Sequence, residues 1–214
     1  TDAPASLAVL LSQSGAVVLA IDVRGVGETG PAPVTRGPAA AALTKLAREH
    51  DATALQSLGF GRTLVGMRAL DVIRGIDLLQ AESRLGEGKL VIVSEGSGGL
   101  WALAAAVNDS RVHGVVTIGT LPSYQLLTHQ RDYAVRGYFV TPGVLRDFDI
   151  PDLARLAATK PQIWVDPVDG LGRPLGQAGA SRLLAPAENL HLVTTANGAA
   201  ADMVRHFTNV FNQP

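Results

Sequence analysis

The sequence has no cysteine, only 5% aromatic residues and no long hydrophobic run. Without cysteine, disulfides, cysteine zinc sites and thiol catalysis are excluded. The longest apolar stretches, such as AVVLAI at residues 16–21, are far too short to span a bilayer. Lys and Arg total 18 against 19 Asp and Glu, a net charge of −1. We therefore expect neither nucleic acid nor an anionic membrane as a main partner.

Apolar residues are abundant. They make up 47% of the 214 residues, enough for a sizeable core, so disorder is excluded for most of the chain. We find no internal repeat, low-complexity tract or linker. The length and composition predict a single domain over residues 1–214.

Short apolar runs alternate with helical patterns along the chain, which is typical of an α/β fold with a parallel sheet covered on both faces. The predicted strands are 16–21, 90–94, 114–118, 162–165 and 190–195. The predicted helices are 6–13, 38–50, 62–81, 100–108, 152–158 and 200–211. Two Gly- and Pro-rich stretches, 25–37 and 166–179, follow strand ends and are the expected site-forming loops.

The motif Gly25-x-Gly27-x-x-Gly30 has the spacing of a dinucleotide fingerprint. That fingerprint needs a helix to open at once, so that the pyrophosphate meets the helix N-terminus. Pro31 and Pro33 follow instead. A nucleotide-binding Rossmann-type module is therefore a disfavoured alternative, and we expect no cofactor.

The same segment, Asp22-x-Arg24-Gly25-x-Gly27, resembles the D-x-R-G-x-G turn after the fourth strand of α/β-hydrolases. Residues 61–79 and 89–109 resemble the helix, nucleophile strand, elbow and following helix of acetyl xylan esterases and related dienelactone-hydrolase-like enzymes. Later elements continue in the order of that family, so the resemblance covers nearly the whole chain. It implies a doubly wound, mostly parallel sheet of the α/β-hydrolase type and hydrolysis of carboxylic esters through a serine acyl-enzyme.

The elbow, where the family nucleophile stands between small neighbours, has two possible registers. With Ser97 at the apex, Glu95 lies two residues before it and would crowd the turn. With Gly96 at the apex, the flanking residues are Ser94 and Gly98, both small. A glycine adopts positive φ without steric penalty, so we favour Gly96 at the apex, which removes the nucleophile. Glu95 as a substitute nucleophile is a remote alternative.

The resemblance places the acid of a triad in the loop after the fourth predicted strand of this chain. Asp169 is the first candidate and Asp166 the second, although residues 167–170 also form an ordinary β-turn sequence. The family histidine belongs in the loop 195–199, which has none. His206 follows in the right chain order but about 9 Å along a helix.

The candidate catalytic residues are therefore Ser97, Asp169 and His206, with Arg24 and Glu95 as candidate substrate-binding residues. No pair of histidines has metal-ligand spacing, so we expect no metal site.

The resemblance also implies that the first three strands and one oxyanion donor of the fold lie outside this chain, which starts at Thr1. In the family, the third strand lies between the fourth and fifth, so a gap is expected between residues 16–21 and 90–94. Either residues 16–21 pair directly with 90–94, or another segment fills the gap. We favour the second arrangement, and therefore expect the remainder of the hydrolase fold or another protein segment as partner. Thr1 is then expected to follow a cut or to belong to a larger assembly.

Two functional hypotheses result. The favoured one is a degenerate esterase-like domain that serves a larger protein or assembly. The other is an active serine carboxylesterase that uses Ser97, Asp169 and His206 on an acylated carbohydrate. The resemblance suggests a periplasmic or secreted location.

Overall fold

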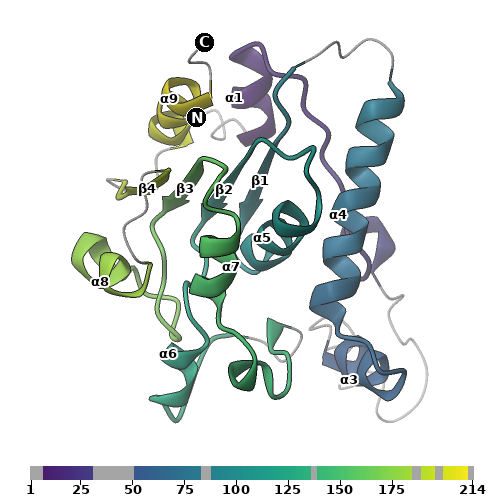
Figure 1. Ribbon diagram of the computed structural model, residues 1–214, viewed down its shortest axis with the longest axis vertical. Helices are drawn as coiled ribbons and strands as arrows, with labels where there is room; N and C mark the ends of the chain where they lie inside the picture. The colour runs from purple at the N-terminus through teal and green to yellow at the C-terminus, as the bar shows by residue number, and fades with distance from the viewer. Residues whose placement is uncertain are drawn as a thin grey trace, which may run out of the picture.

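The computed structural model describes residues 7–30, 51–82, 88–135, 139–184, 189–195 and 200–211. At its centre lies a four-stranded, all-parallel sheet in the order β1-β2-β3-β4, with helices on both faces (Figure 1). The strands are β1 (Val91–Glu95), β2 (Gly114–Ile118), β3 (Gln162–Val165) and β4 (Leu190–Val193). The predicted doubly wound parallel α/β fold is thus confirmed, together with four of its five predicted strands.

The two inner strands, β2 and β3, are the most buried part of the sheet, because helices cover both of their faces. Successive residues point to opposite faces, so Val115 and Trp164 join one core, and Val116 and Ile163 join the other. The first, here named the α5-face core, includes side chains of α4 (Leu64–Ala81), α5 (Gly98–Asn108) and α7 (Ile150–Leu156). The second, named the α9-face core, includes side chains of α1 (Leu7–Gln13) and α9 (Ala200–Phe211).

Three short helices lie around this framework: α3 (Asp51–Gly59), α6 (Gln125–Thr128) and α8 (Gly176–Leu183). Two short 3-10 turns, η1 (Gly27–Thr29) and η3 (Val144–Arg146), complete the described elements. Helix α8 corrects the prediction of a loop through residue 179. Its glycines favour a loop locally, but Ala180 is buried and the helix packs beside β4. The predicted helix 38–50 lies outside the described residues.

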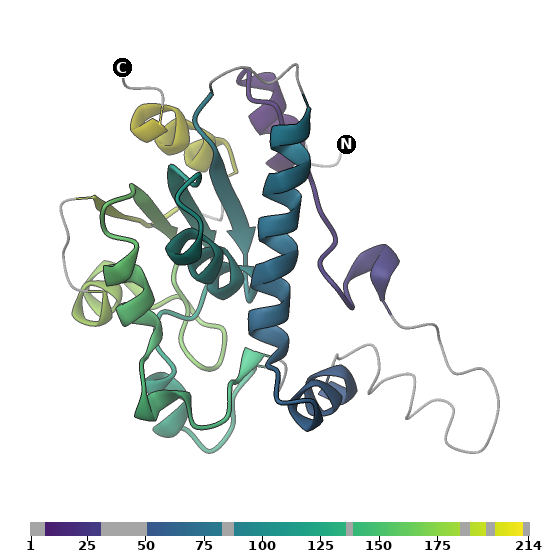
Figure 2. The same ribbon diagram turned by 45° about the vertical axis from the view of Figure 1, so that its right-hand side comes forward.

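The predicted strand 16–21 is wrong. These residues run beside α4 as a connecting segment, and Ile21 packs against Gly75 of that helix (Figure 2). A β-strand exists only with a hydrogen-bonded neighbour, and β1 pairs with β2 alone among the described strands. The apolar, β-branched run therefore has the composition of a strand but lacks a partner.

None of the helices in the described parts of the chain is both long enough and apolar enough to cross a membrane.

Candidate functional site

The carboxyl ends of the first three strands share one backbone geometry. Gly96, Gly119 and Asp166 follow β1, β2 and β3 with φ angles of +56°, +59° and +44°. The N–H group of each donates to the last carbonyl of the next strand: Gly96 to Ile118 at 2.8 Å, Gly119 to Val165 at 2.9 Å and Asp166 to Val193 at 2.9 Å. After each of these three strands, the chain therefore leaves the sheet through a residue with left-handed backbone angles, and a hydrogen bond to the adjacent strand holds that residue in place.

Gly96 forms the crest of the turn between β1 and α5, since β1 ends at Glu95 and α5 begins at Gly98. A Cβ atom built on Gly96 would meet nothing within 4 Å. Ser97 has right-handed helical angles (φ −65°, ψ −20°) as the N-cap of α5, and its side chain makes no capping hydrogen bond. The residue that turns the chain from strand to helix thus carries no side chain, although there is open space for one.

The entry of α5 packs directly on the residue after the β2 exit. The buried Thr120 hydroxyl donates to the carbonyl of Gly96 at 2.8 Å. A Cβ atom on Gly99 would overlap the side chain of Thr120. The two glycines at 96 and 99 therefore serve different needs, positive φ at the crest and close approach one turn later.

Asp166, the second candidate for the acid, joins the ends of β3 and β4. Its carboxylate accepts hydrogen bonds from the backbone N–H of Thr195 at 3.0 Å and from the Thr195 hydroxyl. A non-glycine residue in the left-handed region is uncommon, and aspartate is among the residues that tolerate it. Both contacts hold the two loops together. The contact between Asp166 and Thr195 could not be predicted from the sequence, because no local sequence pattern indicates a contact between two separate loops.

Asp169, the first candidate for the acid, closes a tight turn. Its Oδ1 accepts the backbone N–H groups of Leu171 and Arg173 at 2.9 Å each, and its Oδ2 lies 2.7 Å from Nη2 of Arg173. Desolvation would raise the pKa of Asp169, but the hydrogen bonds from Arg173 and Leu171 outweigh it and lower the pKa. The carboxylate is thus bound to its own loop, beside the Val168–Pro174 bridge.

His206, the candidate base, is exposed on α9, six residues beyond the start of that helix at Ala200. Among the described residues, no hydrogen bond joins any two of Ser97, Asp169 and His206, and their catalytic roles stay predictions. Of the other described histidines, His129 and His191 are exposed, and Nδ1 of His113 accepts the backbone N–H of Leu90 at 3.0 Å. Among the described residues, none of these histidines makes a hydrogen bond to Ser97.

Arg24, a candidate substrate-binding residue, ties its turn to α4. Its Nε donates to Asp71 at 2.7 Å, its backbone N–H donates to the same carboxylate at 2.9 Å, and its carbonyl accepts from Nε of Arg68 at 3.1 Å. Arg68 is fully buried, with its guanidinium 4.6 Å from the ring centre of Trp101. Glu95, the other candidate, has an exposed side chain at the end of β1.

The D-x-R-G-x-G turn has a structural explanation. The Asp22 carboxylate accepts the backbone N–H of Glu28 at 2.9 Å, and a Cβ atom on Gly27 would overlap that carboxylate. Within residues 25–30, the glycines form a turn and the 3-10 turn η1, with no longer helix beginning there. The described parts of the chain contain no group of three or more His, Asp or Glu side chains that could hold a metal ion.

Comparisons with known proteins identify the class to which this arrangement belongs. The family model described as alpha/beta hydrolase fold matches residues 1–163, and the chain belongs to that family. A candidate acetyl xylan esterase from Bacteroides fragilis superposes with a TM-score of 0.64 and 14% identity, over 97% of this chain and 57% of that one. This chain thus spans little more than half the length of that structure.

A second solved structure, the esterase domain of a Rhodothermus marinus protein, gives a TM-score of 0.43 and 17% identity, over 65% of this chain and 63% of that one. The comparison with curated proteins gives no match.

Proposed function

We propose that this chain is a catalytically degenerate domain of the esterase type, which serves a larger protein or assembly rather than hydrolysing an ester. The observation that carries this proposal is the glycine at the crest of the turn between β1 and α5. Gly96 has a φ of +56°, with α5 beginning two residues later. A nucleophile elbow in this fold presents its hydroxyl from that strained turn.

The groups around the crest support the same conclusion. A serine nucleophile needs a base within hydrogen-bond reach and an acid that orients the base. Ser97 lies one residue beyond the crest and makes no hydrogen bond to a described histidine. Asp169 is bound to Arg173 and its own turn, and Asp166 is bound to Thr195. The polar groups at this end of the sheet thus stabilise its loops.

The matched Bacteroides fragilis structure is a candidate acetyl xylan esterase, and it shares the fold of this chain. The ligand class we propose is an acetylated sugar at the carboxyl ends of the strands, where ligands bind in open α/β sheets.

The test is hydrolysis of p-nitrophenyl acetate by the wild-type chain and by Ser97→Ala, His206→Ala and Gly59→Ala. Gly59 lies in α3 with open space around its Cβ position, so its variant serves as a matched control away from the crest. We expect all four proteins to give the same background rate. A wild-type rate that Ser97→Ala abolishes and Gly59→Ala leaves intact would refute the proposal in favour of an active serine carboxylesterase.

A second arm adds the missing hydroxyl through Gly96→Ser. The open space at the crest accommodates the side chain, but a serine without a base is a poor nucleophile. We expect Gly96→Ser to stay at the background rate. A burst of p-nitrophenol equal to the protein concentration in that variant would show that a working base is present, and would contradict the degenerate site.

A further inference from the structure

The loops that follow β2 and β3 lie against each other at the carboxyl end of the sheet. We propose that residues 133–135 and 169–173, here named the paired loops, form a binding platform for one acetylated pyranose ring. In this platform, Tyr133 and Leu171 contact the C–H face of the ring, and Arg173 donates to an acetyl carbonyl. The proposal rests on the ligand class of the proposed function, and it does not depend on whether an ester is hydrolysed.

Direct contacts join the two loops. The backbone N–H of Ala134 donates to the carbonyl of Gly170 at 2.7 Å, and a Cβ atom on Gly172 would lie 3.9 Å from Cβ of Ala134. Tyr133 and Arg173 each stand one residue from this junction, so their Cα atoms are at most about 15 Å apart. A tyrosine and an arginine side chain at that separation can both contact one sugar ring between them.

The platform adjoins the crest of the turn between β1 and α5. The backbone N–H of Val168 donates to the carbonyl of Thr120 at 3.2 Å, and the Thr120 hydroxyl donates to the carbonyl of Gly96 at 2.8 Å. The paired loops therefore belong to the end of the sheet where ligands bind in open α/β folds.

The second of the paired loops is held in shape by its own contacts. Val168 and Pro174 form an antiparallel bridge across its ends, and Asp169 accepts two backbone N–H groups within it. A Cβ atom on Gly170 would lie 3.1 Å from Cδ2 of Leu127, so the loop packs tightly on α6, below the strands in Figure 1. A loop that is already ordered loses little conformational entropy when a ligand binds.

Three side chains on this backbone are exposed. Tyr133 is 51% exposed, Leu171 is 41% exposed and the side chain of Arg173 is 66% exposed. An aromatic ring and an aliphatic side chain supply apolar contact area, and the tyrosine hydroxyl adds a polar group at its edge. The apolar face of a sugar ring is a suitable partner for this surface.

The hydrogen-bonding groups favour an acetylated sugar over a free one. The carboxylate of the paired loops, that of Asp169, already accepts hydrogen bonds from Leu171 and Arg173. Arg173 directs Nε and Nη2 to Asp169, and its Nη1 makes no hydrogen bond to any described residue. A guanidinium is a donor without acceptor capacity. A fully acetylated pyranose complements it, because its polar groups are acceptors and it has no hydroxyl donor.

The test is a titration of the whole chain followed by the amide chemical shifts in NMR spectra. The probe is the fully acetylated methyl xylopyranoside. One control ligand is glycerol triacetate, which has three acetyl esters and no ring, and the other is methyl xylopyranoside, which has the ring and no acetyl group. We expect a Kd of about 1 mM for the probe and at least about fivefold weaker binding of both controls. The shifted amides should lie in residues 133–135 and 169–173.

A first set of variants tests the aromatic ring. Tyr133→Ala should weaken binding of the probe at least about fivefold, whereas Tyr133→Phe keeps the ring and should stay within about twofold of wild type. The matched control is Phe60→Ala, which removes an 84% exposed ring from the turn between α3 and α4. We expect this control to bind the probe as wild type does.

A second set tests the guanidinium. Arg173 and Arg155 each bond through Nη2 to an aspartate at 2.7 Å, and their side chains are 66% and 65% exposed. Arg173→Gln should weaken binding at least about fivefold, and Arg155→Gln on α7 should leave it unchanged. Asp132→Asn, beside the platform, should also leave it unchanged, because the acetylated probe has no donor for a carboxylate.

Four results would overturn the inference. Equal affinity for glycerol triacetate would show that ester groups alone are recognised, and equal affinity for methyl xylopyranoside would show that the acetyl carbonyls are not. Shifts away from the paired loops, or no shifts up to about 20 mM probe, would show that no sugar binds there. Wild-type affinity of Tyr133→Ala or Arg173→Gln would remove these residues from the site. Ester hydrolysis is measured separately as free acetate, so failure of the proposed function is distinguishable from failure of the platform.

Discussion

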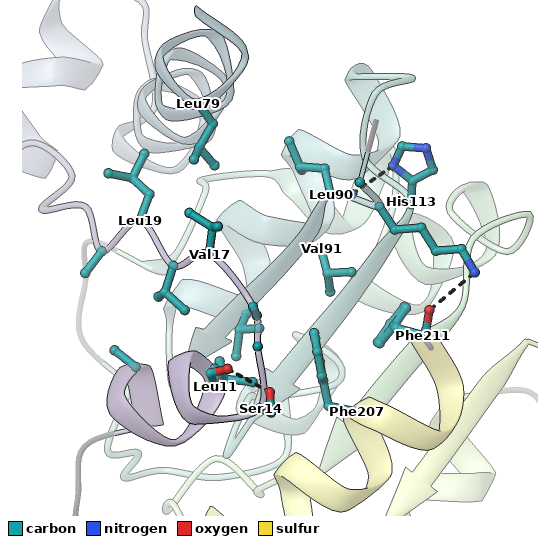
Figure 3. A pocket seen from close by; sticks show the side chains of 18 of the residues that line it. Leu11, Ser14, Val17, Leu19, Leu79, Leu90, Val91, His113, Phe207 and Phe211 are labelled. Carbon is teal, nitrogen blue, oxygen red and sulfur yellow. Dashed lines mark hydrogen bonds between the residues drawn. The ribbon is translucent and has the colours of Figure 1, made fainter. Parts of the chain in front are cut away.

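The sheet has two places where a ligand could bind, and they differ in how their polar groups are used. At the carboxyl ends of the strands, Thr120, Asp166 and Asp169 each accept or donate hydrogen bonds that hold a loop in place. At the lateral edge, β1 and residues 16–21 line one cavity (Figure 3); β1 pairs only with β2 among the described strands, and residues 17–21 make no backbone hydrogen bond to any described residue. The polar side chains at the carboxyl ends thus bond to their own loops, whereas β1 has no described neighbour on the side away from β2.

This difference bears on the proposed function. A carboxylate that already holds two backbone N–H groups stabilises a loop, whereas an unpaired strand edge has binding capacity. Substitutions at the carboxyl ends should therefore change stability more than any activity.

The largest loss of stability is expected from Gly99→Ala. Its new methyl group would overlap the side chain of Thr120, which forces α5 away from the β2 exit. Overpacking of this kind destabilises by about 2 kcal/mol. Urea unfolding measures the effect, with Gly98→Ala as the neighbouring control, because its Cβ would lie 3.4 Å from Cβ of Ser94. Equal stability of the two variants would contradict the tight contact.

Asp166→Ala should cause the second-largest loss of stability. Its free energy of unfolding should fall by about 2 kcal/mol or slightly less, since hydrogen bonds to a charged group contribute about that much. The variant loses both contacts with Thr195 and keeps the left-handed backbone. Asp166→Asn retains an acceptor oxygen and tolerates positive φ, so it should lie closer to wild type. If Asn and Ala variants unfold at the same urea concentration, the Thr195 contacts do not contribute.

Gly96→Ala should lose about 1 kcal/mol, because a Cβ atom is strained at positive φ even where it meets no neighbour. Gly59→Ala tests the difference between backbone strain and space: its Cβ position is also open, but its φ is ordinary. We expect that control to be neutral or slightly stabilised in thermal unfolding. A neutral Gly96→Ala would show that the crest relaxes out of the left-handed region.

The smallest effect concerns pH and the pair Arg24–Asp71. Burial would raise the pKa of Asp71, but hydrogen bonds and charge from Arg24 outweigh it, so its folded pKa lies below the ordinary value. A lowered carboxyl pKa stabilises the fold above the unfolded pKa of about 4, and this stabilisation is lost as the pH falls through the folded value. Asp71→Asn should therefore have a lower free energy of unfolding than wild type at pH 6. In urea unfolding, this difference between the two proteins should shrink below about pH 4. A difference in the free energy of unfolding that does not change with pH would mean that the charge of Asp71 does not contribute to stability.

The strands and most helices could be predicted because their apolar periodicity reflects burial, which is a local property of the sequence. Residues 114–118 and 162–165 are examples, since a strand covered on both faces is largely apolar; Thr117 and Gln162 are their buried polar exceptions. Residues 16–21 have the same composition and the prediction was wrong, because whether a strand forms depends on a partner that composition does not report. Helix α8 was missed for the opposite reason: its glycines indicate a loop, and its packing beside β4 is a tertiary effect.

The candidate site shows the same limit. The small residues around Gly96 predicted which residue crests the turn, because steric crowding is readable from neighbours in sequence. The contact between Asp166 and Thr195 could not be predicted, since it joins loops 29 residues apart. The partner of Asp169, by contrast, is Arg173 four residues on, within the turn that the sequence indicated.

The unequal cores on the two faces of the sheet have a kinetic consequence. Among described residues, the α5-face core has eighteen buried members and the α9-face core has six. Regions with few buried apolar contacts open first, so α9, which packs on the smaller core through Met203 and Phe211, is expected to open before the rest of the fold. Hydrogen exchange in α9 is then expected to be faster than in α5, because opening of the smaller core does not require global unfolding.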